Sequence, residues 1–152
     1  MEVREAQPDD LGDVRRLLIA YANALPFALD FQDFDDELAT LPGRYAPPGG
    51  TLLVGSIDGV VVGCVGVRRL DDETCEMKRL FVGEHTRGSG LGRVLAEASI
   101  DAARRLGYRR MRLDTVPGME TAQALYARLG FAEIDPYTVN PVPGARFLEL
   151  EL

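Results

Sequence analysis

Hydrophobic and polar residues alternate with helical spacing in the first third of the chain. A segment that can form a short strand, residues 1–5, is followed by Pro-Asp-Asp at 8–10, which supplies helix-start chemistry. Apolar residues then recur every three or four positions as far as Tyr21, which predicts a first helix. A second helical stretch, rich in acidic residues, is expected within 31–41 and ends at the Pro- and Gly-containing loop 42–50.

The pattern changes to strands in the middle of the chain. Two segments rich in β-branched residues, 51–57 and 60–70, flank Asp58-Gly59, which is the strongest hairpin signal in the sequence. A short turn then leads into a further strand, 74–82. We therefore expect three consecutive antiparallel strands here.

A long amphipathic helix follows these strands. The apolar positions along one of its faces are Leu91, Leu95, Ala98, Ala102 and Leu106. After it we expect a strand at 109–116, a short helix at 121–129 closed by a glycine, and strands at 131–134 and 146–152. The order β-α-α-β-β-β-α-β-α-β-β predicts a single α/β domain, 1–152, whose mixed sheet carries helices on both faces.

Composition narrows the class of protein. With 152 residues, 46% hydrophobic residues and a net charge of −7, the chain resembles one globular domain whose electrostatic field repels nucleic acid and anionic membranes. Its two cysteines, Cys64 and Cys75, lie in apolar runs without metal-ligand spacing, so we expect reduced core thiols and no metal. The sequence shows no signal-peptide pattern and no run of about 18 apolar residues. These features favour a cytoplasmic protein with no nucleic-acid or membrane partner.

A glycine-rich loop, Arg-Gly-Ser-Gly-Leu-Gly at 87–92, joins the strand 74–82 to the long helix. The first N–H groups of a helix have no intrahelical partner, and the helix dipole places roughly half a positive charge there. The three glycines let the backbone approach a phosphate closely, while Ser89 adds a hydroxyl and Arg87 a positive charge. The loop is therefore predicted to bind a pyrophosphate.

Arg93 helps to decide which phosphate compound fits. It stands where the dinucleotide fingerprint requires glycine, and no Gly-Lys-Ser/Thr follows, so NAD and ATP fit poorly. The arrangement Arg87-x-x-Gly90-x-Gly92 resembles the coenzyme A signature of the GNAT superfamily of N-acetyltransferases. The preceding strand, Met-Lys-Arg-Leu-Phe-Val, and the later segment Leu-Tyr-Ala-Arg-Leu-Gly-Phe at 125–131 resemble that family's pattern in the same order. Together these motifs cover about the C-terminal half of the chain.

The resemblance implies a GNAT-like fold and acetyl-CoA as co-substrate. In that fold the strands 74–82 and 109–116 would run parallel and splay apart, with the pantetheine arm of the cofactor in the gap. Backbone groups of Leu80 and Val82 would pair with the pantetheine, and one N–H would polarise the thioester carbonyl. The implied cofactor-binding residues are Leu80, Phe81, Val82, Arg87, Gly88, Ser89, Gly90, Leu91, Gly92 and Arg93.

Two residues would carry the catalytic chemistry. Tyr126 resembles the family's general acid, which protonates the leaving thiolate, and the alternative is a half-buried tyrosine with one hydrogen bond. Glu76 stands where the histone-acetylating branch carries its base, on the same strand face as Val82. An ion pair with a neighbour such as Lys78, or simple exposure to solvent, is equally compatible with its position.

Two further positions bear on the resemblance. The family often has an asparagine that bonds the pantetheine, and Met119 stands in its place here, so Thr115 or Gln123 would have to substitute. His85, the only histidine in the chain, lies in the loop on the pyrophosphate side, and we interpret it as a surface residue.

The resemblance implies transfer of an acetyl group from acetyl-CoA to a primary amine, on a small molecule or on a protein lysine or N-terminus, by direct attack in a ternary complex. A non-catalytic acyl-CoA-binding sensor or partner subunit is the alternative. A homodimer also fits, since many members of the family pair through late strands. The candidates for the acceptor site are Phe27, Asp30, Phe31, Asp33, Asp35, Tyr45 and Tyr137. A solvated acidic helix face with Phe31 and Phe34 packed inward is the better account of most of them.

Overall fold

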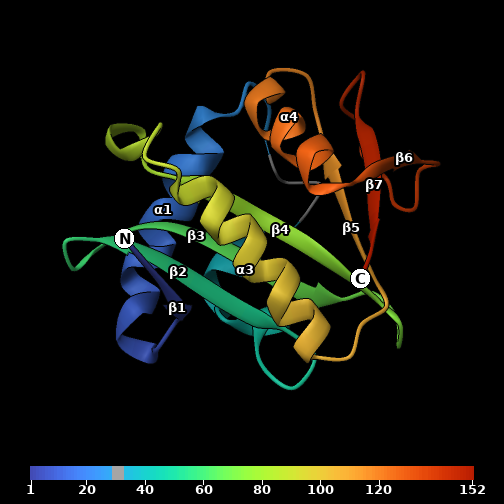
Figure 1. Ribbon diagram of the computed structural model, residues 1–152. Coiled ribbons are helices and arrows are strands. Elements are labelled where there is room, and N and C mark those ends of the chain that lie inside the picture. Colours follow the sequence, from blue (N-terminus) through green and yellow to red (C-terminus); the bar gives the residue numbers. More distant parts are fainter. Residues whose placement is uncertain (29–32) are drawn as a thin grey trace.

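The computed structural model describes residues 1–28 and 33–152, which contain four α-helices and seven strands (Figure 1). The helices are α1 (Leu11–Ala24), α2 (Phe34–Thr40), α3 (Leu91–Arg105) and α4 (Glu120–Leu129). The strands are β1 (Glu2–Glu5), β2 (Thr51–Ile57), β3 (Val60–Arg69), β4 (Thr74–Val82), β5 (Arg110–Thr115), β6 (Ala132–Ile134) and β7 (Arg146–Glu151). Every element expected from the sequence is present in this part of the chain, with ends that differ by a few residues at most.

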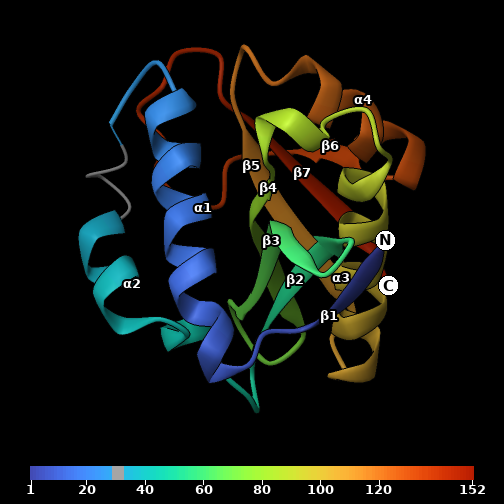
Figure 2. The same ribbon diagram turned by 90° about the vertical axis from the view of Figure 1, so that its left-hand side faces the viewer.

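One mixed sheet organises the fold. Its order is β1-β2-β3-β4-β5-β7-β6, and all neighbours in it are antiparallel except β4 and β5, which run parallel. Helices α1 and α2 cover one face and α3 and α4 the other (Figure 2). Each face carries its own cluster of buried apolar side chains, one around Val14 and Leu18 of α1 and one around Leu91 and Leu95 of α3. The predicted α/β class, with helices on both faces of a mixed sheet, is confirmed.

The two parallel strands separate soon after they meet. β4 and β5 pair only from Thr74 with Arg110 to Glu76 with Arg112, although both strands continue beyond this point. Further along β4, the register with β3 shifts between Cys64 and Gly66, so β4 carries an extra residue there. Such a bulge breaks the regularity of a ladder and bends the strand. The predicted splaying of these strands is therefore confirmed.

Arg79 lies in this bulge and adopts a left-handed conformation, with φ of 61°. A non-glycine residue pays a steric cost there, so surrounding contacts must hold it. Its guanidinium group makes a two-pronged ion pair with Glu37 of α2, at 2.9 and 3.1 Å. It also lies over the rings of Phe34, at 5.3 Å, and Tyr21, at 5.8 Å. With its side chain only 2% exposed, Arg79 fastens both α1 and α2 to the bulge.

The structure also bears on two expectations from the composition, the buried cysteines and the lack of a membrane-spanning helix. Cys64 and Cys75 are buried and carry free thiols. Among the helices of residues 1–28 and 33–152, none combines the length and apolar character of a membrane span.

We predict that Glu37→Ala destabilises the protein by roughly 3–5 kcal/mol, because it leaves the Arg79 guanidinium buried without its counter-ion. Urea denaturation measures the free energy of unfolding. The matched control is Asp101→Ala, which removes an exposed ion pair with Arg104 and should cost less than about 1 kcal/mol. Equal losses for the two variants would contradict a holding role for the Arg79–Glu37 pair.

Candidate active site

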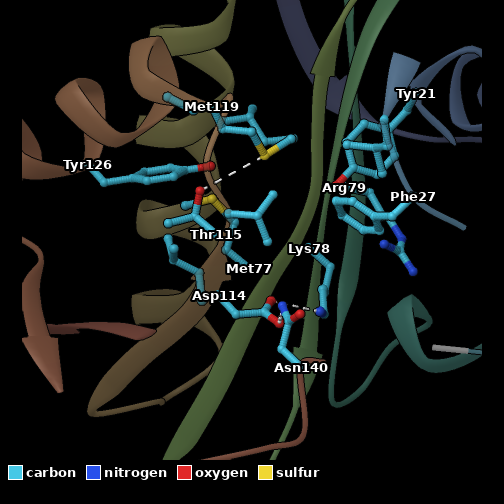
Figure 3. Close-up of a pocket in the computed structure, with 15 residues that line it drawn as sticks. Tyr21, Phe27, Met77, Lys78, Arg79, Asp114, Thr115, Met119, Tyr126 and Asn140 are labelled. Atoms are coloured by element: carbon cyan, nitrogen blue, oxygen red, sulfur yellow. Dashed lines mark hydrogen bonds and ion pairs between the residues drawn. The ribbon is translucent and has the colours of Figure 1, made fainter. Parts of the chain in front are cut away.

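A pocket opens where β4 and β5 separate, and it encloses about 620 Å³ when the space open to solvent is counted. Its walls come from α1 and the segment after it, β4, β5, α4, and the loop between β6 and β7 (Figure 3). Tyr126 reaches it from α4 on one face of the sheet, and Tyr21 reaches it from α1 on the other. The gap between the strands therefore connects the two faces of the sheet.

Tyr126 is the tyrosine that α4 contributes to this pocket, and it is largely buried. It is 8% exposed, and its ring packs edge-on against Phe131 with the centroids 5.7 Å apart. Burial raises the pKa of the Tyr126 hydroxyl, and the nearby Tyr21 and Asp114 raise it further. The phenol is thus protonated at neutral pH and can donate a proton but cannot act as a base.

A charged cluster occupies the opposite wall. The Lys78 ammonium lies 3.0 Å from Asp114 Oδ1, and the Asn140 amide donates to Asp114 Oδ2, also at 3.0 Å (Figure 3). Burial alone would raise the pKa of Asp114, but the Lys78 charge and the hydrogen bonds from Lys78 and Asn140 outweigh it and lower that pKa. Asp114 therefore faces the pocket as a carboxylate over the neutral pH range.

Glu76 lies beside this cluster, 1% exposed, and is absent from the described lining of the pocket. Its Oε1 accepts a hydrogen bond from Arg68 at 2.8 Å, and its Oε2 accepts one from the Tyr137 hydroxyl at 2.5 Å. The Lys78 ammonium is 3.8 Å from Oε2. Of the arrangements compatible with the sequence, the structure shows the ion pair, with Arg68 as the nearer partner, while the role of base stays a prediction.

The glycine-rich loop forms a tight entry to α3. Gly88 and Gly90 adopt left-handed φ values of 85° and 89°, and Gly90 caps the helix. The Leu91 N–H donates to Ser89 Oγ at 3.3 Å, whereas the next two N–H groups of the helix have no acceptor in residues 1–28 and 33–152. Free amides at a helix N-terminus suit an anion, as the sequence predicts.

Arg87 holds its charge beside this loop. Its guanidinium lies 5.6 Å from the centre of the Phe81 ring, and its Nε donates a long hydrogen bond of 3.4 Å to the Val82 carbonyl. Arg93, in the first turn of α3, pairs with Glu97 at 2.6 Å on the exposed face. Both guanidinium groups thus lie at the solvent edge of the predicted anion site.

Comparisons with known proteins decide the family. Residues 14–131 match the model of the Acetyltransferase (GNAT) family. The chain belongs to this family. An uncharacterized N-acetyltransferase of Schizosaccharomyces pombe is 39% identical over 147 residues, which cover 95% of this chain and 90% of that protein. An uncharacterized N-acetyltransferase of Dictyostelium discoideum is 29% identical, with 95% of each chain covered.

A solved structure agrees with this membership. The yncA protein of Salmonella typhimurium, solved with its cofactor acetyl-CoA, is 26% identical and has a TM-score of 0.79. The likeness covers 99% of this chain and 93% of that one. The protein is accordingly a GNAT N-acetyltransferase.

The position of the usual GNAT asparagine is occupied by Met119, which lines the pocket. Of its two suggested substitutes, Thr115 also lines the pocket, and its hydroxyl contacts Met119 Sδ at 3.9 Å. Gln123 is absent from the described lining. Its amide N–H donates to the Val116 carbonyl at 2.9 Å, and its amide oxygen accepts from Arg146 at 3.1 Å. Thr115 is therefore the better placed of the two.

The acceptor candidates fall into separate groups. Phe27 lines the pocket. Tyr137 is absent from the described lining, and its hydroxyl donates a hydrogen bond to Glu76. Tyr45 is buried in the core cluster under α1, where burial raises the pKa of its hydroxyl. Exposed positions on or next to α2 are held by Asp33 and Asp35, while Asp30 and Phe31 lie outside the described residues. His85 is exposed in its loop, in agreement with its interpretation as a surface residue.

Sequence reasoning missed the charged wall of the GNAT pocket. Lys78 and Asp114 stand in strands of mostly alternating character, which marks them as facing away from the α3 core. No local sequence pattern predicts that Lys78 pairs with Asp114, 36 positions later, or that Asp114 bonds Asn140, a further 26 positions along. For Tyr21 of α1 the sequence indicates only an apolar position of the first helix, because its spacing fits the helical period.

We predict that Gly90→Asp weakens acetyl-CoA binding roughly tenfold or more, because it adds a negative charge at the anion site and a side chain at a left-handed residue. Isothermal titration calorimetry measures the affinity. Gly107→Asp is the matched control, since Gly107 is also left-handed, with φ of 93°, but follows the C-terminal end of α3. If both variants bind acetyl-CoA equally well, the loop does not hold the pyrophosphate.

Proposed function

We propose that this GNAT enzyme moves the acetyl group of acetyl-CoA to a primary amine, on a small molecule or on a protein lysine or N-terminus, by direct attack in a ternary complex. The observation that carries the proposal is the gap between β4 and β5, which brings the Tyr126 phenol and the charged cluster to one pocket from opposite walls. Two substrates can meet there because the gap joins both faces of the sheet.

The chain has groups suited to each part of coenzyme A. Free amides at the start of α3, with the left-handed glycines before them, fit the pyrophosphate, and Arg87 supplies a positive charge beside them. Beyond Glu76, β4 lacks β5 as a hydrogen-bonding neighbour, so backbone groups of Leu80 and Val82 can pair with the pantetheine amides as an added strand would. Phe81, the loop 87–93 and Thr115 complete the proposed contacts.

Acetyl-CoA, when bound, supplies an activated thioester. The attacking amine must be neutral, so an ammonium first releases a proton to water. Its nitrogen then forms the new C–N bond while the C–S bond breaks, the nitrogen releases a further proton to water, and the leaving sulfur needs a proton. Tyr126 holds such a proton at Oη, because burial raises its pKa, and we assign it the role of general acid. Asp114, which stays ionised beside Lys78 at 3.0 Å, gives the pocket a polar wall that can accept a hydrogen bond from the amine.

Other expectations remain predictions. A cytoplasmic location, a homodimer, and the absence of nucleic-acid and membrane partners rest on the sequence and the resemblance alone. A non-catalytic acyl-CoA sensor would bind the cofactor without releasing thiol, and a buried phenol aimed into the pocket favours the enzyme.

We predict that Tyr126→Phe lowers turnover by tens-fold or more while acetyl-CoA affinity is retained, because only the donated proton is lost. Coenzyme A release is followed with a thiol reagent, using the most active amine from a panel of the twenty common amino acids, spermidine, tyramine and a lysine-containing peptide with a free N-terminus. Tyr108→Phe is the control, since that buried tyrosine bonds the Gly49 carbonyl away from the pocket. Unchanged turnover in Tyr126→Phe would remove this residue from the mechanism.

A further inference from the structure

The loop between β6 and β7, residues 135–145, is tied to the pocket by two side chains. The Tyr137 hydroxyl donates to Glu76 of β4 at 2.5 Å, and the Asn140 amide donates to Asp114 of β5 at 3.0 Å. In each case a neutral donor from the loop meets a carboxylate from the sheet, which gives a strong class of hydrogen bond. The two ties reach the two strands whose separation creates the pocket.

Both carboxylates are fixed in place by cations of the sheet. Arg68 of β3 holds Glu76 at 2.8 Å, and Lys78 lies between the two acids, 3.8 Å from Glu76 and 3.0 Å from Asp114. Charges of opposite sign therefore alternate across β3, β4 and β5. The side chains of Glu76, Lys78 and Asp114 are each at most 7% exposed, so the loop is held by groups buried in the sheet.

The loop itself has few other ties. The Tyr137 ring packs edge-on against Phe147, with centroids 5.6 Å apart, and Arg112 lies over it at 5.5 Å. Within the loop, the Val142 N–H donates to Asn140 Oδ1 at 3.1 Å, so the Asn140 side chain also shapes the turn. Between the two tied residues the chain is exposed to solvent, with Val139 82% exposed.

We propose that Tyr137 and Asn140 latch the 135–145 loop to Glu76 and Asp114 and thereby set the affinity of the enzyme for its amine acceptor. The inference rests on the proposed function, and it makes Glu76 a positioning residue that acts through Tyr137. Both oxygens of Glu76 already accept hydrogen bonds, and the pocket contains Asn140 but not Glu76 among its described lining residues. Tyr126 and the α3 loop lie on other elements, so loosening the latch leaves proton donation and cofactor binding intact.

The first test compares the effect of a substitution on the KM for the amine with its effect on kcat. In Tyr137→Phe the ring contacts remain and only the hydrogen bond to Glu76 is lost, so KM for the amine should rise about fivefold or more, with kcat and the KM for acetyl-CoA within about twofold of the parent. Tyr108→Phe, which also loses one buried hydroxyl, should leave all three constants unchanged. An unaltered amine KM in Tyr137→Phe, or an equal rise in Tyr108→Phe, would overturn the proposal.

A second variant separates positioning from base catalysis. If Glu76 affects amine binding through Tyr137, the hydrogen bond that joins them is already lost in Tyr137→Phe. Adding Glu76→Gln to that background should then change the amine KM by less than about twofold, although Glu76 also pairs with Arg68. If Glu76 is the base, Glu76→Gln should instead lower kcat by about a hundredfold or more in either background, and that result would overturn the positioning role.

Hydrogen exchange measures how firmly the 135–145 loop is held, and it needs no amine acceptor. We expect Tyr137→Phe and the isosteric Asn140→Asp, which sets a second carboxylate against Asp114, to speed exchange in peptides covering residues 135–145, with α3 unchanged. Unchanged loop exchange in both variants would overturn the latch. If no amine in the panel is acetylated, the proposed function fails, while faster loop exchange would still support the latch and unchanged exchange would reject it.

Discussion

The buried pair between Arg79 and Glu37 is the interaction on which the rest of the structure depends. A guanidinium that is 2% exposed would be costly without its carboxylate, and the residue that carries it sits in a left-handed bulge that most side chains avoid. The pair therefore fixes the bulge and ties α2 to β4, while the Tyr21 ring brings α1 to the same point. With the bulge in place, β4 bends and no longer pairs with β5, and the gap between them becomes the pocket.

In the proposed reaction, this gap lets one site serve two substrates. On the side of α3 and α4, it offers free amides, a protonated phenol and an unpaired strand edge. On the side of α1 and the 135–145 loop, it offers ionised groups, with Lys78 balanced by Asp114 and Glu76 balanced by Arg68. Buried ion pairs contribute little stability compared with apolar packing. Their place in the wall of the pocket is better explained by the loop side chains that they bind and by a polar substrate.

Much of the fold could be predicted because its signals are local. Asp58-Gly59 marks the hairpin, the spacing from Leu91 onward marks α3, and the glycines before it mark the turn. The left-handed Arg79 had no such signal, because only its ion pair with a residue 42 positions earlier makes that conformation tenable. The sequence predicts Tyr137 only as an acceptor candidate, since its hydrogen bond to Glu76 spans 61 positions and depends on the folded sheet. For Glu76 the sequence left base and ion pair open, and only the folded surroundings show Arg68 as its partner.

The central claim, that the gap between β4 and β5 and the loop before α3 form an acetyl-CoA site, is tested most directly by a thermal-shift titration with acetyl-CoA, coenzyme A, NAD and ATP. A ligand that binds only the folded state raises the melting temperature by an amount set by its concentration relative to its Kd. We predict a concentration-dependent rise with acetyl-CoA and coenzyme A and none with NAD or ATP. A melting temperature that does not change with either coenzyme A compound, or that rises equally with all four ligands, would contradict the claim.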